Sequence, residues 1–210
     1  MDMQIPLTNQ QLEDTVAILR NGGVVAYPTD TLYGLGASTL SNKGLDKLFE
    51  IKGRPPIMAL PVFLSDHEEL EQVAEEVPEL ARILAAHFWP GALTLVLLKK
   101  DWIPDRITGN QPTVGVRIPD HPLPRALVAK LGAPITATSA NLSGRPAAQN
   151  VQEVNLQLGP GLDLIIDGGP SPVGYPSTVL DCSRPKPFII REGAISRTDI
   201  ELVSGVALGN

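Results

Sequence analysis

The beginning of the chain changes from a helix-like to a strand-like spacing of apolar residues. Apolar positions recur every three to four residues over 12–19, behind Thr8 as a candidate N-cap, and the pattern stops at the Asn-Gly-Gly of 21–23. This spacing predicts a helix. The apolar run 24–27 follows directly, so we expect a buried strand that leads into a loop over 28–36.

The same two spacings predict the remaining elements. Further helices are expected from Ser41 to Gly53, from Asp66 through an acidic stretch, from Ala81 to Phe88 and from Pro122 to Leu131. Strands are expected at 57–64, 92–98, 113–118, 135–139, 164–166, 177–180 and 188–191. Pro61 interrupts the first of these strands, because proline cannot donate to a strand ladder.

The strand at 113–118 alternates clearly between apolar and other residues. Val114, Val116 and Ile118 share one face, so Thr113 and Arg117 share the other. We find neither an internal repeat nor a linker long enough to divide the chain. The sequence therefore predicts an α/β fold, with residues 1–210 forming a single domain around a twisted, mixed, open β-sheet flanked by helices.

The charge of the chain is unevenly distributed. Its 17 basic and 23 acidic residues give a formal net charge of −6, which at first argues against binding of polyanions. Seven of the acids lie in the single stretch 66–79, which contains no lysine or arginine, and the remaining residues carry 17 basic and 16 acidic groups. The net charge therefore does not exclude an anion-binding cleft elsewhere.

Other sequence features exclude several classes of protein. The single cysteine, Cys182, cannot form an internal disulfide, no cluster of histidine and cysteine has metal-binding spacing, and we expect no protein-borne metal site. No apolar run is long enough to span a membrane and the N-terminus lacks a secretory pattern, so a cytoplasmic protein is expected. The pair Gly34 and Gly36 lacks the third glycine of a dinucleotide fingerprint, and no P-loop motif is present.

Cations and hydroxyl groups gather at predicted strand and helix ends. Lys52, Arg54, Arg117 and Arg191 supply the cations, and Thr31, Thr113, Ser139 and Ser177 supply the hydroxyl groups. Each cation taken alone fits an ordinary solvated surface residue as well as a binding residue. Open α/β sheets, however, bind ligands at strand ends, and such groups together suit phosphate, carboxylate or bicarbonate.

Seven ordered motifs give the chain a family resemblance. They are Pro28–Gly36 (PTDTLYGLG), Lys52–Pro55 (KGRP), Phe88–Leu95 (FWPGALTL), Val114–Pro119 (VGVRIP), Thr138–Gly144 (TSANLSG), Pro176–Asp181 (PSTVLD) and Ile190–Gly193 (IREG). In this order they resemble the YrdC-like family of threonylcarbamoyl-AMP synthases, over residues of about 10–198. The K-x-R and S-x-N pairs resemble the hallmark of the synthase. The length resembles that of members without an extra C-terminal domain.

The resemblance implies an activity. L-threonine, bicarbonate and ATP, with Mg²⁺ on the phosphates, would give threonylcarbamoyl-AMP and pyrophosphate for the threonylcarbamoyladenosine (t6A) modification of tRNA. Transferase proteins would act downstream. Such chemistry depends on alignment and charge stabilisation more than on a nucleophile, which agrees with the lack of a Ser-His-Asp or Cys-His set.

The resemblance also implies roles for single residues. Threonine would be held by Thr31, Arg117, Ala137 and Ser177, with Arg117 on the carboxylate. The ATP side would be lined by Thr113, Ser139, Asn141, Ala147 and Arg191. Lys52 and Arg54 would be catalytic and would neutralise phosphate charge.

One stretch departs from the family pattern and leaves alternatives open. Met58 stands where many relatives have Asn or Lys, and Phe63 stands where some have a His that contacts threonine. A phenylalanine side chain cannot hydrogen-bond a substrate. Either the packing of this loop has drifted without effect on activity, or the chain is a YrdC-like paralogue with altered substrate choice. A third hypothesis is a non-catalytic factor for double-stranded RNA binding or ribosome maturation, whose binding would weaken steeply with salt.

Overall fold

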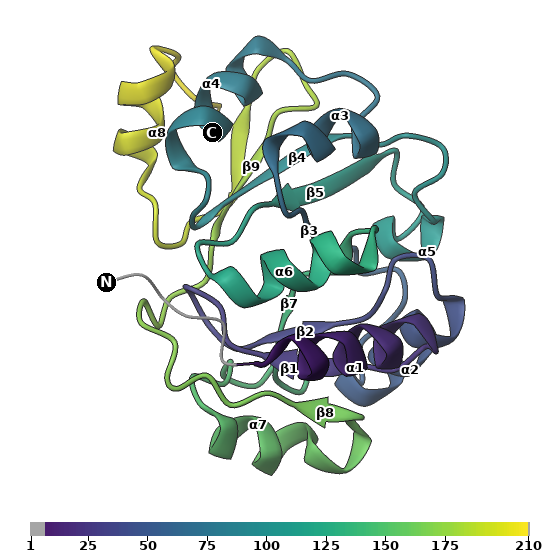
Figure 1. The fold of residues 1–210 in the computed structure, drawn as a ribbon. Helices are drawn as coiled ribbons and strands as arrows, with labels where there is room; N and C mark the ends of the chain where they lie inside the picture. The colour runs from purple at the N-terminus through teal and green to yellow at the C-terminus, as the bar shows by residue number, and fades with distance from the viewer. Residues whose placement is uncertain (1–6, 210) are drawn as a thin grey trace.

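The computed structural model describes residues 7–209, and these form an α/β fold with two mixed sheets flanked by helices (Figure 1). The four-stranded sheet has the order β7-β2-β1-β8, and the six-stranded sheet has the order β10-β9-β4-β5-β3-β6. Parallel and antiparallel pairs occur in both sheets. The predicted class is confirmed, but the strands are divided between two sheets instead of one.

The four-stranded sheet is built from very short strands. They are β1 (Val25–Tyr27), β2 (Gly34–Gly36), β7 (Thr138–Ser139) and β8 (Leu164–Ile165). The prediction of a loop throughout 28–36 was wrong, because its last three residues form β2. The two glycines of β2 serve close packing, since a Cβ on Gly34 or Gly36 would lie 2.8 or 2.7 Å from a ring carbon of Tyr27.

The six-stranded sheet contains the longer strands. They are β3 (Val62–Phe63), β4 (Leu93–Leu98), β5 (Thr113–Arg117), β6 (Ile135–Thr136), β9 (Thr178–Asp181) and β10 (Phe188–Arg191). The strand predicted at 57–64 is reduced to β3. Residues before it form a turn, and the carbonyls of Met58 and Ala59 accept hydrogen bonds from the Arg54 side chain.

The segment 135–139, predicted as one strand, passes from one sheet to the other. Its first two residues pair with β3 of the six-stranded sheet, and its last two pair with β2 of the four-stranded sheet. Ala137 lies between them and donates its N–H to the carbonyl of Pro61 at 2.7 Å. This crossing brings the ends of both sheets together.

Four predicted helices are present with nearly the predicted bounds. They are α1 (Asn9–Arg20), α2 (Asn42–Lys52), α4 (Glu79–Phe88) and α6 (Pro122–Leu131). Thr8 and Gln11 form the capping box of α1. Gly53 ends α2 in the left-handed conformation (φ 57°) that glycine adopts at little cost.

The remaining helical segments were predicted poorly or not at all. The acidic stretch from Asp66 forms only η1 (His67–Glu69) and α3 (Leu70–Val73). Its buried residues are confined to Leu70, Val73 and Ala74. The unpredicted elements are α5 (Asp105–Thr108), α7 (Val151–Leu158), η2 (Gly159–Gly161) and α8 (Arg197–Ser204). Asn150 and Ser196 cap α7 and α8, and these residues were the available signals.

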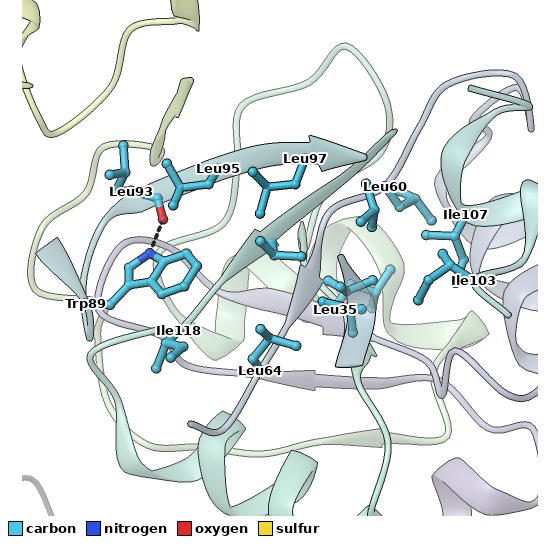
Figure 2. Close-up of a cluster of buried hydrophobic side chains, with 14 of the residues drawn as sticks. Leu35, Leu60, Leu64, Trp89, Leu93, Leu95, Leu97, Ile103, Ile107 and Ile118 are labelled. Carbon is cyan, nitrogen blue, oxygen red and sulfur yellow. Dashed lines mark hydrogen bonds between the residues drawn. The ribbon is translucent and has the colours of Figure 1, made fainter. Parts of the chain in front are cut away.

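Two apolar clusters hold the layers together. In Figure 1, α6 lies between the six-stranded sheet with α3, α4 and α8 and the four-stranded sheet with α1, α2 and α7. The larger cluster joins Leu35 of β2 to Leu93, Leu95 and Leu97 of β4 (Figure 2). The indole N–H of Trp89 donates to the carbonyl of Leu93 at 2.7 Å, so this buried polar group is satisfied (Figure 2).

A membrane-spanning role is not supported by any described helix. Among residues 7–209, none is both long and apolar enough to cross a bilayer.

The packing of β2 on Tyr27 gives a test of the fold. Gly36→Ala should lower the free energy of unfolding by about 1–3 kcal/mol, because the new methyl group meets the Tyr27 ring within a filled core. Gly44→Ala is the control, since its Cβ would have no neighbour closer than 3.4 Å and alanine favours helix. Urea unfolding should show a loss for the first variant alone; equal stabilities would contradict the packing argument.

Candidate functional site

A cavity of about 480 Å³ opens where the two sheets meet. Its walls come from the loop after β1, the end of β5, the crossing between β6 and β7, and the segments that lead into β9 and close β10. Nine residues singled out from the sequence line it: Thr31, Arg54, Arg117, Ala137, Ser139, Asn141, Ala147, Ser177 and Arg191. The structure therefore brings together positions that lie up to 160 residues apart along the chain.

Arg117 is the most deeply buried cation on the cavity wall. It ends β5, and its Nη2 donates to both carboxylate oxygens of Asp30 at 2.5 and 2.6 Å. Its Nε donates to the carbonyl of Gly91 at 2.8 Å, and its Nη1 donates to Oγ1 of Thr31 at 3.1 Å. Burial lowers the pKa of Arg117, and Asp30 opposes this shift.

These bonds limit what Arg117 can still hold. Each of its three nitrogens has a partner among residues 7–209, and the two short contacts of Nη2 both go to the Asp30 carboxylate. Nη1 carries two N–H groups and has one partner there, the hydroxyl of Thr31. A carboxylate that enters the cavity would therefore meet Nη1, because Nε and Nη2 are already engaged.

Lys52 is placed differently from the sequence-based expectation. Its side chain is buried behind the cavity wall, and its ammonium donates to the carbonyls of Ser139 at 2.5 Å and Asn141 at 2.9 Å. The carbonyl of Lys52 in turn accepts the N–H of Ser143 at 2.9 Å. Burial, with a smaller contribution from Arg54, lowers the pKa of Lys52 to about 7.

Ser139 and Asn141 belong to the same network. The Ser139 hydroxyl donates to Oδ1 of Asn141 at 2.5 Å, and Nδ2 of Asn141 donates to the carbonyls of Leu142 and Arg145 at 2.9 and 2.7 Å. The loop 139–145 is thus shaped by buried polar bonds, and it presents Ser139 and Asn141 to the cavity.

Two further guanidinium groups face the cavity. Arg54 is anchored by the carbonyl of Ala59 at 2.8 Å, and Arg191 by the carbonyl of Ser177 at 2.8 Å and its hydroxyl at 3.2 Å. Burial lowers the pKa of both arginines, and neighbouring positive charge adds to the shift: Arg191 acts on Arg54, and Arg117 acts on Arg191. An anion between these groups would relieve their mutual repulsion.

Of the remaining residues expected in the site, one lines the cavity and two do not. Thr113 lies opposite Leu98 at the far end of β5 and does not line the cavity. It shares a face with Arg117, but four residues of strand separate the two by about 13 Å. Phe63 lines the cavity, with its ring 5.6 Å from the Arg117 guanidinium, whereas Met58 is exposed and does not line it.

Sequence reasoning missed several neighbours of the site. Thr29, Gln149, Gly174 and the exposed Arg145 line the cavity, and Asp30 lies directly behind it. Four of these flank or fall within the quoted motifs, so a contact role could have been sought there. Among residues 7–209, no group of three or more His, Cys, Asp or Glu side chains is arranged to hold a metal ion.

Comparisons with known proteins show the family of the chain. A family model for Sua5/YciO/YrdC, described as "Telomere recombination", matches residues 17–193. The threonylcarbamoyl-AMP synthase of Bacillus subtilis (strain 168) is 42% identical over 203 residues, which cover 96% of this chain and 59% of that relative.

Two solved structures are similar over most of the chain. Sua5 of Pyrococcus abyssi complexed with L-threonine has a TM-score of 0.92 and 39% identity, over 96% of this chain and 59% of that one. Escherichia coli YciO has a TM-score of 0.82 and 29% identity, over 92% and 94% of the two chains. The chain thus spans less than two thirds of the Bacillus and Pyrococcus relatives, and it belongs to the Sua5/YciO/YrdC family.

Proposed function

We propose that the protein is a threonylcarbamoyl-AMP synthase, an ATP-dependent nucleotidyltransferase. The observation that carries the proposal is one cavity in which the guanidinium groups of Arg54, Arg117 and Arg191 converge beside hydroxyl groups. A carboxylate, a bicarbonate and a triphosphate all require such donors. The name of the Bacillus relative and the bound threonine of the Pyrococcus relative agree with this choice.

The reaction would proceed in two balanced steps. The amine of L-threonine attacks the carbon of bicarbonate and water is lost, which gives a carbamate. A carbamate oxygen then attacks the α-phosphorus of ATP in line, the bond from that phosphorus to the bridging oxygen breaks, and pyrophosphate leaves. The protein's task is to align the two substrates and to offset negative charge on the leaving group.

The threonine side of the cavity follows from the contacts of Arg117. Its remaining Nη1 N–H is offered to the amino-acid carboxylate, and Thr31, which accepts from the same nitrogen, lines this wall. The backbone of Ala137 lies on the same wall. Ser177 completes this side, and its hydroxyl is oriented by Thr94 at 2.9 Å.

The ATP side is proposed to use the rest of the wall. Arg54 and Arg191 would stabilise the triphosphate, while Ser139, Asn141 and Ala147 would contact the nucleotide. Among residues 7–209, no Asp or Glu side chain lines the cavity, so Mg²⁺ would enter with ATP as part of the substrate.

Lys52 is proposed to support the site without contacting the phosphates. Its amine fixes two carbonyls of the loop 139–145, and even the uncharged form has two N–H groups for these acceptors. The role as a phosphate-neutralising catalytic residue does not fit its buried position.

The downstream partners belong to the same proposal. The product would pass to threonylcarbamoyl transferase proteins that modify tRNA, in the cytoplasm. The RNA-binding alternative gains no support from the site, because a cavity of about 480 Å³ with a buried Arg117 is too small for a duplex, which needs an exposed basic face.

The activity itself is the first test. Purified protein with ATP, Mg²⁺, bicarbonate and L-threonine should release pyrophosphate. Serine should support release much less well, because it lacks a methyl group that would be buried on binding. Coupled detection of pyrophosphate measures this. Release that is absent, or that does not depend on threonine, would overturn the proposal.

The assignment of Arg54 to the triphosphate gives a second test. Arg54→Gln should raise the half-saturating ATP concentration by about 10-fold or more, with little change for threonine, because a charge-assisted contact to phosphate is lost. Arg82→Gln, which removes an exposed partner of Glu71 outside the cavity, is the control. Equal behaviour of the two variants would remove Arg54 from the site.

The burial of Lys52 predicts a pH dependence of stability. Between pH 7 and the ordinary pKa of lysine, the unfolded chain binds a proton that the folded chain has released, so the free energy of unfolding rises with pH in this window. The contribution approaches about 1.4 kcal/mol per pH unit. Lys52→Met should remove this slope in urea unfolding measured at pH 7, 8 and 9. An unchanged slope would show that Lys52 does not titrate there.

A further inference from the structure

Asp30 has no role in the reaction described so far, although it lies in the middle of a loop that lines the cavity. Its side chain is 9% exposed and does not itself line the cavity, whereas its neighbours Thr29 and Thr31 do. Both of its oxygens accept from Nη2 of Arg117. A buried carboxylate is costly without such a partner, so its position requires an explanation.

Hydrogen bonds also hold the backbone at Asp30 and Thr31. Its carbonyl accepts the N–H of Val173 at 3.2 Å, and the carbonyl of Thr31 accepts the N–H of Gly174 at 3.0 Å. The carboxylate is therefore presented to Arg117 from a fixed loop. Its direction does not depend on a flexible side chain alone.

The contacts of Arg117 show how the Asp30 carboxylate fixes the direction of the guanidinium. Gly91 fixes Nε, both carboxylate oxygens of Asp30 accept from Nη2, and the Phe63 ring lies 5.6 Å from the guanidinium carbon. With these directions occupied, only Nη1 is left to serve the cavity, beside the hydroxyl of Thr31. Without Asp30, the guanidinium would be free to turn Nη2 toward any incoming anion, triphosphate included.

We propose that Asp30 is a positioning residue that holds the Arg117 guanidinium so that Nη1 is the donor offered to the carboxylate of the amino-acid substrate. The assignment rests on the proposed function, which supplies the identity of that substrate. Asp30 touches no substrate and acts through Arg117. It thereby reserves Arg117 for the amino acid, while Arg54 and Arg191 remain for the phosphates.

The test compares threonine with ATP in variants of Asp30. Asp30→Ala should raise the half-saturating threonine concentration by about 10- to 100-fold and that of ATP by less than about 2-fold, because only the orientation of Arg117 is lost. Asp30→Asn keeps one acceptor for Nη2 and should show a smaller rise, about 3- to 10-fold. The graded rescue by asparagine is a result that a general loss of structure would not produce.

A matched control separates positioning from stability. Asp181 is also a buried carboxylate with an arginine partner, Arg184 at 3.4 Å, but it does not line the cavity. Asp181→Asn should leave both half-saturating concentrations unchanged, and thermal melting of all variants shows which remain folded. If Asp30→Ala does not fold, the isosteric Asp30→Asn carries the comparison.

Direct binding distinguishes failure of this proposal from failure of the proposed function. Titration calorimetry with L-threonine should show weaker binding to Asp30→Asn than to the unaltered protein, whether or not pyrophosphate is released. Unaltered threonine binding in a folded Asp30→Asn or Asp30→Ala variant would overturn the positioning role. An equal rise for threonine and ATP would overturn it as well.

Discussion

The ion pair between Asp30 and Arg117 joins the two sheets at the point where the cavity opens. Asp30 follows β1 of the four-stranded sheet, and Arg117 ends β5 of the six-stranded sheet. Two buried charges cost free energy to remove from water, and the loss of either partner would leave the other uncompensated. The pair therefore fixes the loop after β1 against the end of β5, and both segments line the cavity.

The same pair makes the positive charge of the cavity wall uneven. Arg117 carries a compensated charge, whereas Arg54 and Arg191 are bonded to neutral carbonyls and keep an uncompensated one. A singly charged carboxylate suits the compensated end, and a triphosphate suits the uncompensated end. None of the seven acids of 66–79 lines the cavity, so the negative net charge of the chain does not act against this division at short range.

Local signals predicted four of the longer helices well, but they missed α7 and α8 and did not predict the division into two sheets. The capping box at Thr8 and the stop at Gly53 are encoded within a few residues, and the structure has both. The glycines of 34–36 signal a turn by composition, yet they form a strand because the ring of Tyr27 occupies the space of a side chain. The division of the segment 135–139 at Ala137 depends on which strands lie beside each half. The alternation of apolar residues along the chain does not indicate which strands become neighbours.

The roles of the polar residues in the site were also difficult to predict from the sequence. The sequence predicts that cations and hydroxyl groups lie at strand ends. The role of each residue, however, depends on whether its side chain is buried or faces the cavity. Lys52 and Arg54 stand two positions apart, yet α2 directs the first into the interior and the second, beyond the helix end, into the cavity. The K-x-R and S-x-N pairs thus combine two functions: Lys52 and Asn141 shape the loop 139–145, and Arg54 and Ser139 face the space that this loop encloses. These pairs act as a folding unit as well as a part of the cavity wall, because the loop that lines the cavity is held by residues of the same pairs.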